Sequence, residues 1–288
     1  MSALGQAHPP LHQVRAIIQR ALDEDIGGGD VTTDNSVPAD QRSRAVLLAK
    51  QDGVLCGVRV FAETLMMVDA GVTVDVRLPD GATISKGSVA ARIEGPTRAL
   101  LTGERTSLNF VQRLSGVATT TAAFAARLRG LPTRLIDTRK TTPGLRVLEK
   151  YAVRVGGGHN HRFNLADAVL LKDNHLAALR SGGIDLADAV RTIKQRVPHT
   201  MKVEVEVTAL EQIEAALTGG ADIILLDNMS NDDMREAVRR IKGRALTECS
   251  GNVTLETVRE RAETGVDLIS SGALTHSAKA VDLSLEID

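Results

Sequence analysis

The sequence predicts an α/β protein in which a small N-terminal domain precedes a larger α/β barrel. The chain has 288 residues, 43% hydrophobic and 25% charged, enough for one large and one smaller globular domain. From residue 133 onward, short apolar runs alternate with helical segments, the later runs about every 20 residues. Repeated strand–helix units predict a parallel sheet. This many units favours closure into a barrel; an open, doubly wound sheet stays an alternative, although no GxGxxG follows the first strand.

The N-terminal part reads as a mixture of helices and short strands. Helical spacing of apolar residues begins at Leu11 and reaches Leu22, and a second helix is expected over 60–67. Pro96 opens a long helical region, which we expect Gly116 to interrupt before an alanine-rich helix ending at Leu128. Strands are expected at 45–49, 72–76 and 89–93.

We therefore place the domain boundary near Gly116. The predicted domains are 1–116, an α/β sandwich, and 117–288, the barrel, and the segment 277–288 is left open to pack back on the first domain.

Polar side chains follow each apolar run of the barrel region. The runs are 135–137, 168–171, 203–207, 223–226, 246–249 and 268–270. Because the carboxyl ends of barrel strands meet on one face, these polar groups are expected to surround one pocket.

The polar groups divide by their chemistry. The cations that can bind carboxylates or phosphates are Arg139, Lys140, His161, Arg162 and Lys172. Glu206 and Asp227 are carboxylates for ribose hydroxyls or magnesium. Two small turns, 250–252 and 270–272, can surround a phosphate with backbone N–H groups, and a helix is expected to start at Thr254. Together they predict a pocket for a sugar phosphate and a separate small anion.

The segment 134–172 concentrates positive charge. It holds eight Lys or Arg against three acids, although the whole chain has 35 basic and 36 acidic residues. Such an excess attracts a small, multiply charged anion. Arg134, Arg146 and Lys150 are expected to be ordinary surface charges. Two further interpretations remain open: zinc binding by His159 and His161, and a Schiff base on Lys172.

Composition argues against several classes of protein. The chain has no Trp, one Tyr and four Phe, and its neutral balance adds to the case against a nucleic-acid partner. No apolar run has the length of a membrane span, and the N-terminus lacks the pattern of a secretory signal. Cys56 and Cys249 form no paired motif, so we expect reduced thiols and a cytoplasmic location.

Several motifs resemble the quinolinate phosphoribosyltransferase family, and they occur in the expected order along nearly the whole chain. The most specific is the ten-residue run 137–146, DTRKTTPGLR. The others are 24–25, 29–32, 103–106, 108–109, 156–162, 170–175, 204–207, 226–228, 250–252 and 270–275.

The resemblance implies a small α/β sandwich followed by an incomplete, seven-stranded α/β barrel. It implies a homodimer with active sites at the subunit interface, where Arg105 of one subunit reaches the barrel of the other, and leaves a hexameric arrangement of dimers open. The implied reaction joins quinolinate to 5-phosphoribosyl 1-diphosphate with Mg²⁺, giving nicotinate mononucleotide, diphosphate and CO₂.

The resemblance also implies roles for particular residues. The catalytic residues are Lys140, Glu206 and Asp227, which also bind phosphoribosyl diphosphate. The residues around quinolinate are Arg105, Thr138, Arg139, His161, Arg162 and Lys172. The residues around the phosphate are Ser250, Gly251, Asn252, Ser270, Ser271 and Gly272. Magnesium is held mainly through the substrate, with Glu206 and Asp227 as candidate ligands.

Other functions stay open. A phosphoribosyltransferase for nicotinate or another monocarboxylate is the first alternative, although the adjacent His161 and Arg162 favour a second carboxylate. A non-catalytic anion-binding protein and a Schiff-base lyase using Lys172 are the others.

Overall fold

The structure, a computed structural model, describes residues 8–288. We expect the N-terminus to lack a secretory signal, and its first seven residues lie outside this range. The chain forms two compact units. Unit 1 contains the described residues up to Ala122, with 141–157 and 274–288, and unit 2 contains 123–140 and 158–273. The predicted boundary near residue 116 remains a prediction.

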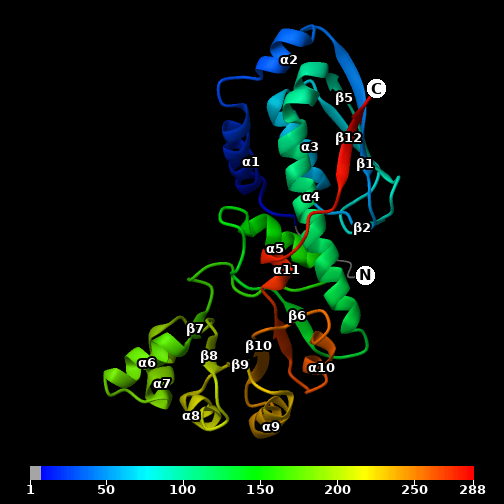
Figure 1. The fold of residues 1–288 in the computed structure, drawn as a ribbon. Coiled ribbons are helices and arrows are strands. Elements are labelled where there is room, and N and C mark those ends of the chain that lie inside the picture. The colour runs from blue at the N-terminus through cyan, green and yellow to red at the C-terminus, as the bar shows by residue number, and fades with distance from the viewer. Residues whose placement is uncertain (1–7) are drawn as a thin grey trace. The chain divides into compact units, whose positions relative to one another are not determined.

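Unit 1 is built on a four-stranded antiparallel sheet with the order β12-β1-β5-β3. Its strands are β1 (Arg42–Ala49), β3 (Thr73–Val76), β5 (Val89–Pro96) and β12 (Leu283–Ile287), and a two-stranded sheet pairs β2 (Gly53–Val54) with β4 (Thr83–Ile84). Its helices are α1 (Leu11–Ile26), α2 (Val31–Ser36), α3 (Val58–Val68), most of α4 (Thr97–Arg127) and α5 (Arg146–Val155). Figure 1 shows the labelled elements. The expected helices and strands of this region are present, with ends that differ by a few residues: β3 begins one residue later than expected, whereas α1, β1 and β5 are longer.

Burial explains why these segments take their forms. In α1, Val14, Ile17, Ile18 and Leu22 are buried on one face, as helical spacing requires, whereas Leu11 is exposed. The core of unit 1 joins β1, β5 and α3 through residues such as Leu47 and Phe61. The small apolar C-terminal strand β12 contributes Leu283 and Leu285 to the same core, because it pairs antiparallel with β1.

The expected break at Gly116 is wrong, since α4 is continuous from Thr97 to Arg127. Gly116 serves packing instead of ending the helix. A Cβ at this position would lie 2.1 Å from the carbonyl oxygen of Lys279. The glycine therefore allows the C-terminal segment to approach the helix closely, at a small cost in helix propensity.

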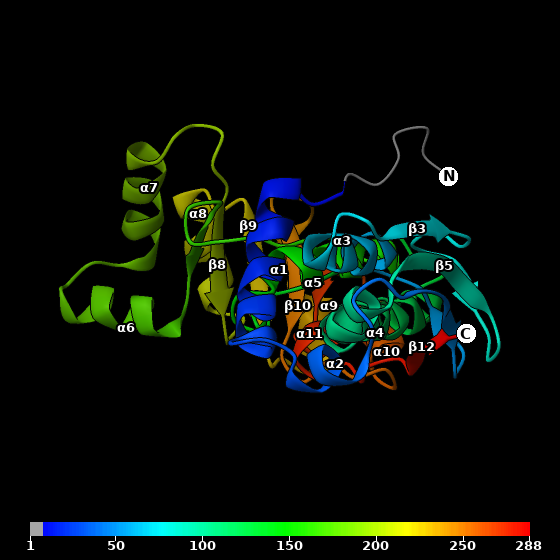
Figure 2. The same cartoon turned by 90° about the horizontal axis from the view of Figure 1, so that it is seen from above.

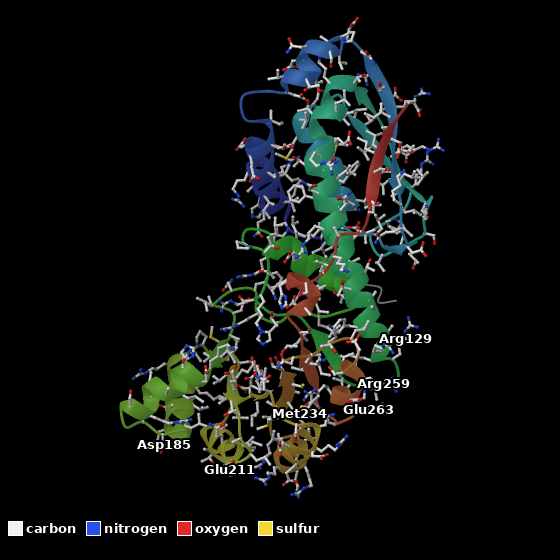
Figure 3. The ribbon with its side chains drawn as sticks, viewed as in Figure 1. Arg129, Asp185, Glu211, Met234, Arg259 and Glu263 are labelled. Atoms are coloured by element: carbon white, nitrogen blue, oxygen red, sulfur yellow. The ribbon has the colours of Figure 1, made fainter. Side chains whose placement is uncertain are left out.

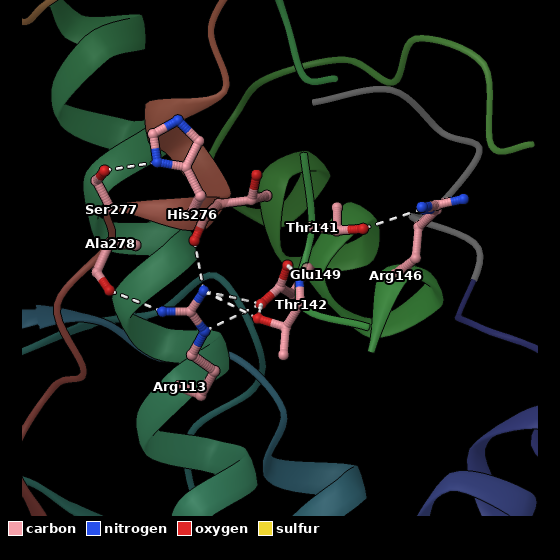
Figure 4. A network of polar contacts seen from close by, with 9 residues as sticks. Arg113, Thr141, Thr142, Arg146, Glu149, His276, Ser277 and Ala278 are labelled. Carbon is pink, nitrogen blue, oxygen red and sulfur yellow. Dashed lines mark hydrogen bonds and ion pairs between the residues drawn. The ribbon is translucent and has the colours of Figure 1, made fainter. Parts of the chain in front are cut away.

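A buried ion pair fastens the same segment to the helices of unit 1 (Figure 4). Arg113 of α4 donates from Nε (3.0 Å) and Nη2 (2.9 Å) to Oε1 of Glu149, whose side chain is fully buried. Arg113 also donates to the carbonyl oxygens of Thr275 and Ala278. Glu149 accepts the backbone N–H of Thr142 at 3.0 Å and its hydroxyl at 2.7 Å. One carboxylate thus joins α4, α5, the loop at Thr142 and, through Arg113, the segment before β12.

The next residue on α5 corrects a second expectation. Lys150 is fully buried, so it is not a surface charge, and Arg146 is only partly exposed; Arg134 is exposed as expected. The sequence pattern of α5 could not reveal this, because seven of its ten residues are buried and the helix has no broad exposed face.

Unit 2 is built on a six-stranded parallel sheet with the order β6-β11-β10-β9-β8-β7. The strands are β6 (Arg134–Ile136), β7 (Val169–Leu171), β8 (Val203–Val207), β9 (Ile223–Asp227), β10 (Leu246–Ser250) and β11 (Leu268–Ser270). They match the six predicted runs. The sheet order ends at β6 and β7, and His159 forms an isolated parallel bridge with Ile136 beside β6. The implied count of seven strands is not confirmed.

Helices alternate with these strands. They are α6 (Asp173–Ser181), α7 (Leu186–Arg196), α8 (Gln212–Gly219), α9 (Asn231–Ile241) and α10 (Val258–Ala262). After β11 comes α11 (Ala273–His276), which belongs to unit 1 from its second residue on. Figures 1 and 2 both place α7 and α8 beside β8. Figure 3 labels Met234, a fully buried residue of α9, together with Arg259 of α10 and Glu263, which follows that helix. Arg259 Nε and Glu263 Oε1 form an ion pair at 2.9 Å. The expected helix start at Thr254 is wrong: residues 254–257 form a turn, and the helix begins at Val258.

None of the described helices is both long and apolar enough to span a membrane.

Replacing Arg113 by Met should destabilise unit 1 by about 3–5 kcal/mol, because the buried Glu149 carboxylate would lose its cation. Urea titration of the free energy of unfolding measures this loss. The matched control is Arg44→Met, which removes a cation from an exposed pair with Glu94 at 3.4 Å, and should cost at most about 1 kcal/mol. Equal effects of the two substitutions would contradict the importance of the buried pair.

Candidate active site

The polar ends of the parallel strands lie at one edge of unit 2. Asp227 and Ser250 occupy paired positions at the ends of β9 and β10, and Lys172 follows the end of β7. On β8, Glu204 and Glu206 are two residues apart and therefore share a face of the sheet. Glu206 and Glu248 both align with Leu225 of β9, which places Glu248 of β10 on that face too.

Asp137 holds the segment 159–162 beside the end of β6. Its carboxylate is fully buried. Oδ1 accepts the backbone N–H of His161 at 2.8 Å, and Oδ2 accepts the side-chain N–H of Asn160 at 2.7 Å. Nearby, the Thr138 hydroxyl accepts the backbone N–H of Lys140 at 3.0 Å. Asp137 and Thr138 therefore shape the backbone that carries the predicted cations.

Arg139 and Arg162 lie close enough to repel each other. Burial, and then the charge of Arg139, lower the pKa of Arg162, while Glu204 and Asp167 act in the opposite direction. Arg162 Nη1 donates to the carbonyl oxygen of Ala168 at 3.1 Å. Holding two guanidinium groups together is unfavourable without an anion, so this pair is suited to bind one.

His161 sits between these cations and two buried carboxylates. Its Nδ1 accepts the backbone N–H of Arg162 at 2.7 Å. Its Nε2 lies 3.0 Å from Glu204 Oε2 and 3.7 Å from Glu248 Oε2. Because Nδ1 is an acceptor, Nε2 carries the proton and donates it to Glu204.

The same three residues form a group that could hold a metal ion, with ligand atoms within 4.8 Å of one another. The sequence had suggested the pair His159 and His161 for zinc, without a third ligand nearby. The structure places Glu204 and Glu248 next to His161 instead. The proton on Nε2 occupies the position that a metal would need, so the hydrogen-bond geometry argues against a metal here.

Lys172 and Glu206 form a direct ion pair. Lys172 Nζ is 2.8 Å from Glu206 Oε2, and the side chain of Lys172 is 49% exposed against 7% for Glu206. Glu206 Oε1 also accepts the backbone N–H of Asp173 at 3.3 Å. Lys172, which is predicted to bind quinolinate, and Glu206, which is predicted to bind phosphoribosyl diphosphate, are therefore adjacent.

The two predicted phosphate turns differ in how their groups are used. In the second turn, the Ser271 backbone N–H donates to Ile136 at 3.1 Å and its hydroxyl to Val253 at 3.3 Å. Ser270 is also buried and bonds to Glu248. In the first turn, Ser250 and Gly251 are half-buried and Asn252 is exposed. The first turn is therefore the more accessible to a ligand.

Arg105 belongs to unit 1, where it is exposed on α4. The C-terminal end of α1 and the N-cap of α2 are each joined to this part of α4 by a hydrogen bond. Thr106 donates to Asp25 and Thr102 donates to Asp30, each at 3.0 Å. The motifs 24–25, 29–32 and 103–106 thus meet around the base of Arg105.

The sequence places Asp137, Glu204 and Asn228 in the strand-end motifs but assigns none of them a role, and it does not single out Glu248. One signal existed, because the alternation in 203–207 puts Glu204 and Glu206 on the same face. Glu248 lies inside an apolar run, where nothing local distinguishes it from a solvent-facing residue.

The buried Glu248 gives a test by pH. Burial, followed by the charge of Glu204, raises the pKa of Glu248 well above 4.5. The folded state therefore binds this proton more tightly than the unfolded state, and the parent protein loses stability as the pH rises above 4.5 toward the folded pKa. Glu248→Gln removes this loss, so its stability relative to the parent should increase with pH by up to about 1.4 kcal/mol per pH unit. Urea unfolding at pH 5, 6.5 and 8 (roughly spanning the window) measures it.

Glu236→Gln is the control of opposite sign. Hydrogen bonds from Arg239 and Arg240 lower the pKa of the partly exposed Glu236 to about 2. That substitution should reduce stability at neutral pH, and the difference should vanish as the pH falls through about 2. A Glu248→Gln difference that does not depend on pH would contradict the assignment of a tightly held proton.

Comparison with known proteins identifies the family. The N-terminal domain of quinolinate phosphoribosyl transferase matches residues 30–115, and the C-terminal domain matches residues 117–286. A probable nicotinate-nucleotide pyrophosphorylase (carboxylating) of Bacillus subtilis is 41% identical over 96% of this chain and 93% of the relative. Quinolinate phosphoribosyltransferase (decarboxylating) 1b of Nicotiana tabacum is 42% identical over 98% of this chain and 84% of its own.

Solved structures agree with this match. The crystal structure of NadC from Streptococcus pyogenes superimposes with a TM-score of 0.93, at 42% identity over 98% of this chain and 99% of that one. The nicotinate-nucleotide pyrophosphorylase of Francisella tularensis gives a TM-score of 0.90 at 38% identity, covering 97% of both chains. The expected fold class, an α/β sandwich with a parallel α/β domain, is confirmed, and the chain belongs to the quinolinate phosphoribosyltransferase family.

Proposed function

We propose that this chain is a nicotinate-nucleotide pyrophosphorylase (carboxylating) that transfers phosphoribosyl from 5-phosphoribosyl 1-diphosphate to quinolinate, as an enzyme of NAD biosynthesis. The products are nicotinate mononucleotide, diphosphate and CO₂. The observation that carries the proposal is that cations from separate parts of unit 2 act on one group of buried carboxylates. Glu204 and Arg139 both act on the charge of Arg162, and Lys172, which pairs with Glu206, also acts on Glu248. A pyridine dicarboxylate requires more than one cation.

The quinolinate side of the site follows from charge and geometry. Arg139 and Arg162 are assigned to the carboxylates, because each guanidinium can pair with a carboxylate through two hydrogen bonds. A bound dianion would also relieve the repulsion between them. Thr138 and Lys172 complete this subsite, and Arg105 is proposed to come from a second subunit. His161 supports the backbone of Arg162 from within.

The phosphoribosyl side is assigned to Lys140, Glu206 and Asp227, with the turn 250–252 for the 5-phosphate. Glu206 and Asp227 stabilise the cationic sugar that forms as diphosphate leaves, and Lys140 stabilises the departing diphosphate. The carboxylate oxygens of Glu206 and Asp227 suit Mg²⁺, which prefers oxygen ligands and often binds through substrate phosphates. Magnesium would supply further charge neutralisation on the diphosphate.

The chemical step requires no general base. The pyridine nitrogen uses its lone pair to form the bond to the anomeric carbon as the carbon–oxygen bond to diphosphate breaks. The ring is then cationic, so the electron pair of the adjacent carbon–carboxylate bond can remain on the ring when CO₂ leaves. A proton from solvent completes the product. Catalysis is therefore mainly positioning and electrostatic stabilisation.

A homodimer in the cytoplasm is part of the proposal. Both cysteines are buried and free of disulfides, which supports a reducing compartment. The exposed Arg105 supports a site that a second subunit completes.

Replacing Lys140 or Arg105 by Ala should lower kcat by at least about a hundredfold, because each removes a cation from a site where charge develops. The measurement is CO₂ release and nicotinate mononucleotide formation from quinolinate, with nicotinate as the comparison acid. Lys86→Ala, at an exposed residue outside the candidate site, is the control. Melting temperatures should match the parent. If the parent protein turned over nicotinate, without CO₂ release, in place of quinolinate, the monocarboxylate alternative would be favoured. If the parent turned over neither acid, the chain would be an anion-binding protein.

Mixing the two inactive variants tests the shared site. In a hybrid dimer, the barrel of the Arg105→Ala subunit retains Lys140 and receives the intact Arg105 of its partner. Random exchange of subunits should therefore restore about a quarter of the parent activity. If Arg105 served its own subunit, every site in the mixture would lack one cation and no activity would return. Activity of the separate variants after the same unfolding and refolding treatment is the control.

A further inference from the structure

The loops after β9 and β10 are joined by a chain of side-chain hydrogen bonds. Asn252 Nδ2 donates to Asn228 Oδ1 at 3.1 Å, and Asn228 Nδ2 donates to Asp227 Oδ2 at 2.9 Å. An ionised carboxylate only accepts hydrogen bonds, so the amino group of Asn228 must face Asp227. This leaves its oxygen to accept from Asn252, and the direction of the chain is fixed.

The backbone holds Asn228 in this central position. Its φ of 53° lies in the left-handed region, which residues other than glycine adopt infrequently. Its backbone N–H donates to the carbonyl oxygen of Ser250 at 3.0 Å. The neighbouring Gly251 leaves room for the amide, since a Cβ there would lie 2.2 Å from Asn228 Oδ1. The two loops are therefore fitted to each other around one side chain.

We propose that Asn228 is a positioning residue, which sets the separation between the ribose-binding Asp227 and the phosphate-binding turn 250–252. The inference rests on the proposed function, which gives these two groups neighbouring parts of one substrate. The amide engages Oδ2 of Asp227 and so turns Oδ1 toward the ribose hydroxyls. It also fixes Asn252, and with it the turn whose N–H groups receive the 5-phosphate. Asn228 itself is not assigned a contact with substrate.

Two substitutions separate the side chain from the backbone. Asn228→Gly keeps the left-handed conformation, because glycine adopts it without strain, and removes both hydrogen bonds. Asn228→Asp keeps the size and replaces the donor by a carboxylate that repels Asp227. Lys242→Gly is the control, since Lys242 also has a left-handed φ, of 50°, at the exposed end of α9.

The first measurement is binding of 5-phosphoribosyl 1-diphosphate with Mg²⁺ by calorimetry, together with KM for both substrates. Both Asn228 variants should weaken this binding, and raise its KM, by tenfold or more, which is about 1.4 kcal/mol or above. The KM for quinolinate should stay within about twofold, and the melting temperature of Asn228→Gly should match that of the parent. Lys242→Gly should change none of these values. Unchanged binding in both Asn228 variants would overturn the inference, and so would equal losses for both substrates.

A second measurement tests whether the chain acts as a unit. Asn252→Gly removes the other end of the chain and keeps the left-handed φ of 50°. The double variant should bind the diphosphate substrate no more weakly than the weaker single variant, because either change interrupts the same connection. Fully additive losses would refute the chain. If the parent bound this substrate but did not turn over quinolinate, the proposed function would be wrong. The comparison of binding between the parent and the Asn228 variants would still test the positioning role of Asn228.

Discussion

Four carboxylates, Asp137, Glu204, Glu206 and Glu248, are buried in the parallel-sheet unit, and buried carboxylates are costly unless donors or cations face them. Each has such a partner or neighbour: the backbone of His161 for Asp137, the ring of His161 for Glu204, Lys172 for Glu206, and Ser270 for Glu248. Folding therefore has to bring these donors to the sheet. Of these groups, His161 and Lys172 also belong to the candidate site, so that stability of the unit and binding of an anion depend in part on the same side chains.

The same contacts connect the buried carboxylates to the cations of the site. Glu204 and Glu248 lie within the sheet, His161 connects them to the backbone of Arg162, and the charge of Arg139 acts on Arg162 in turn. Repulsion between these two groups is tolerated because Glu204 opposes it. A ligand dianion would take over part of that role, which links substrate binding to electrostatics already present in the folded protein.

Much of this organisation could be predicted from the sequence. The apolar runs identified all six parallel strands, and polar residues after those runs identified the edge where the cations gather, because both follow from local patterns. Other features depend on contacts between distant segments. Gly116 looked like a helix break, yet its missing side chain admits Lys279. Lys150 is expected to be a surface charge, yet it is buried. No local pattern reports a contact such as that of Gly116 with Lys279, which lies more than a hundred residues away in the chain.

In our proposal for Asn228, contacts between distant segments position groups of the active site. Asp227 and Ser250 are separated in sequence by a complete helix, but their strands place them in register. Register alone fixes the backbone, and it leaves the side chain of Asp227 free to rotate. A short amide in the left-handed region is one of few side chains that can reach both neighbours from this position, because asparagine tolerates that conformation better than most residues. The position thus combines a backbone requirement with a hydrogen-bonding requirement, and asparagine satisfies both at once.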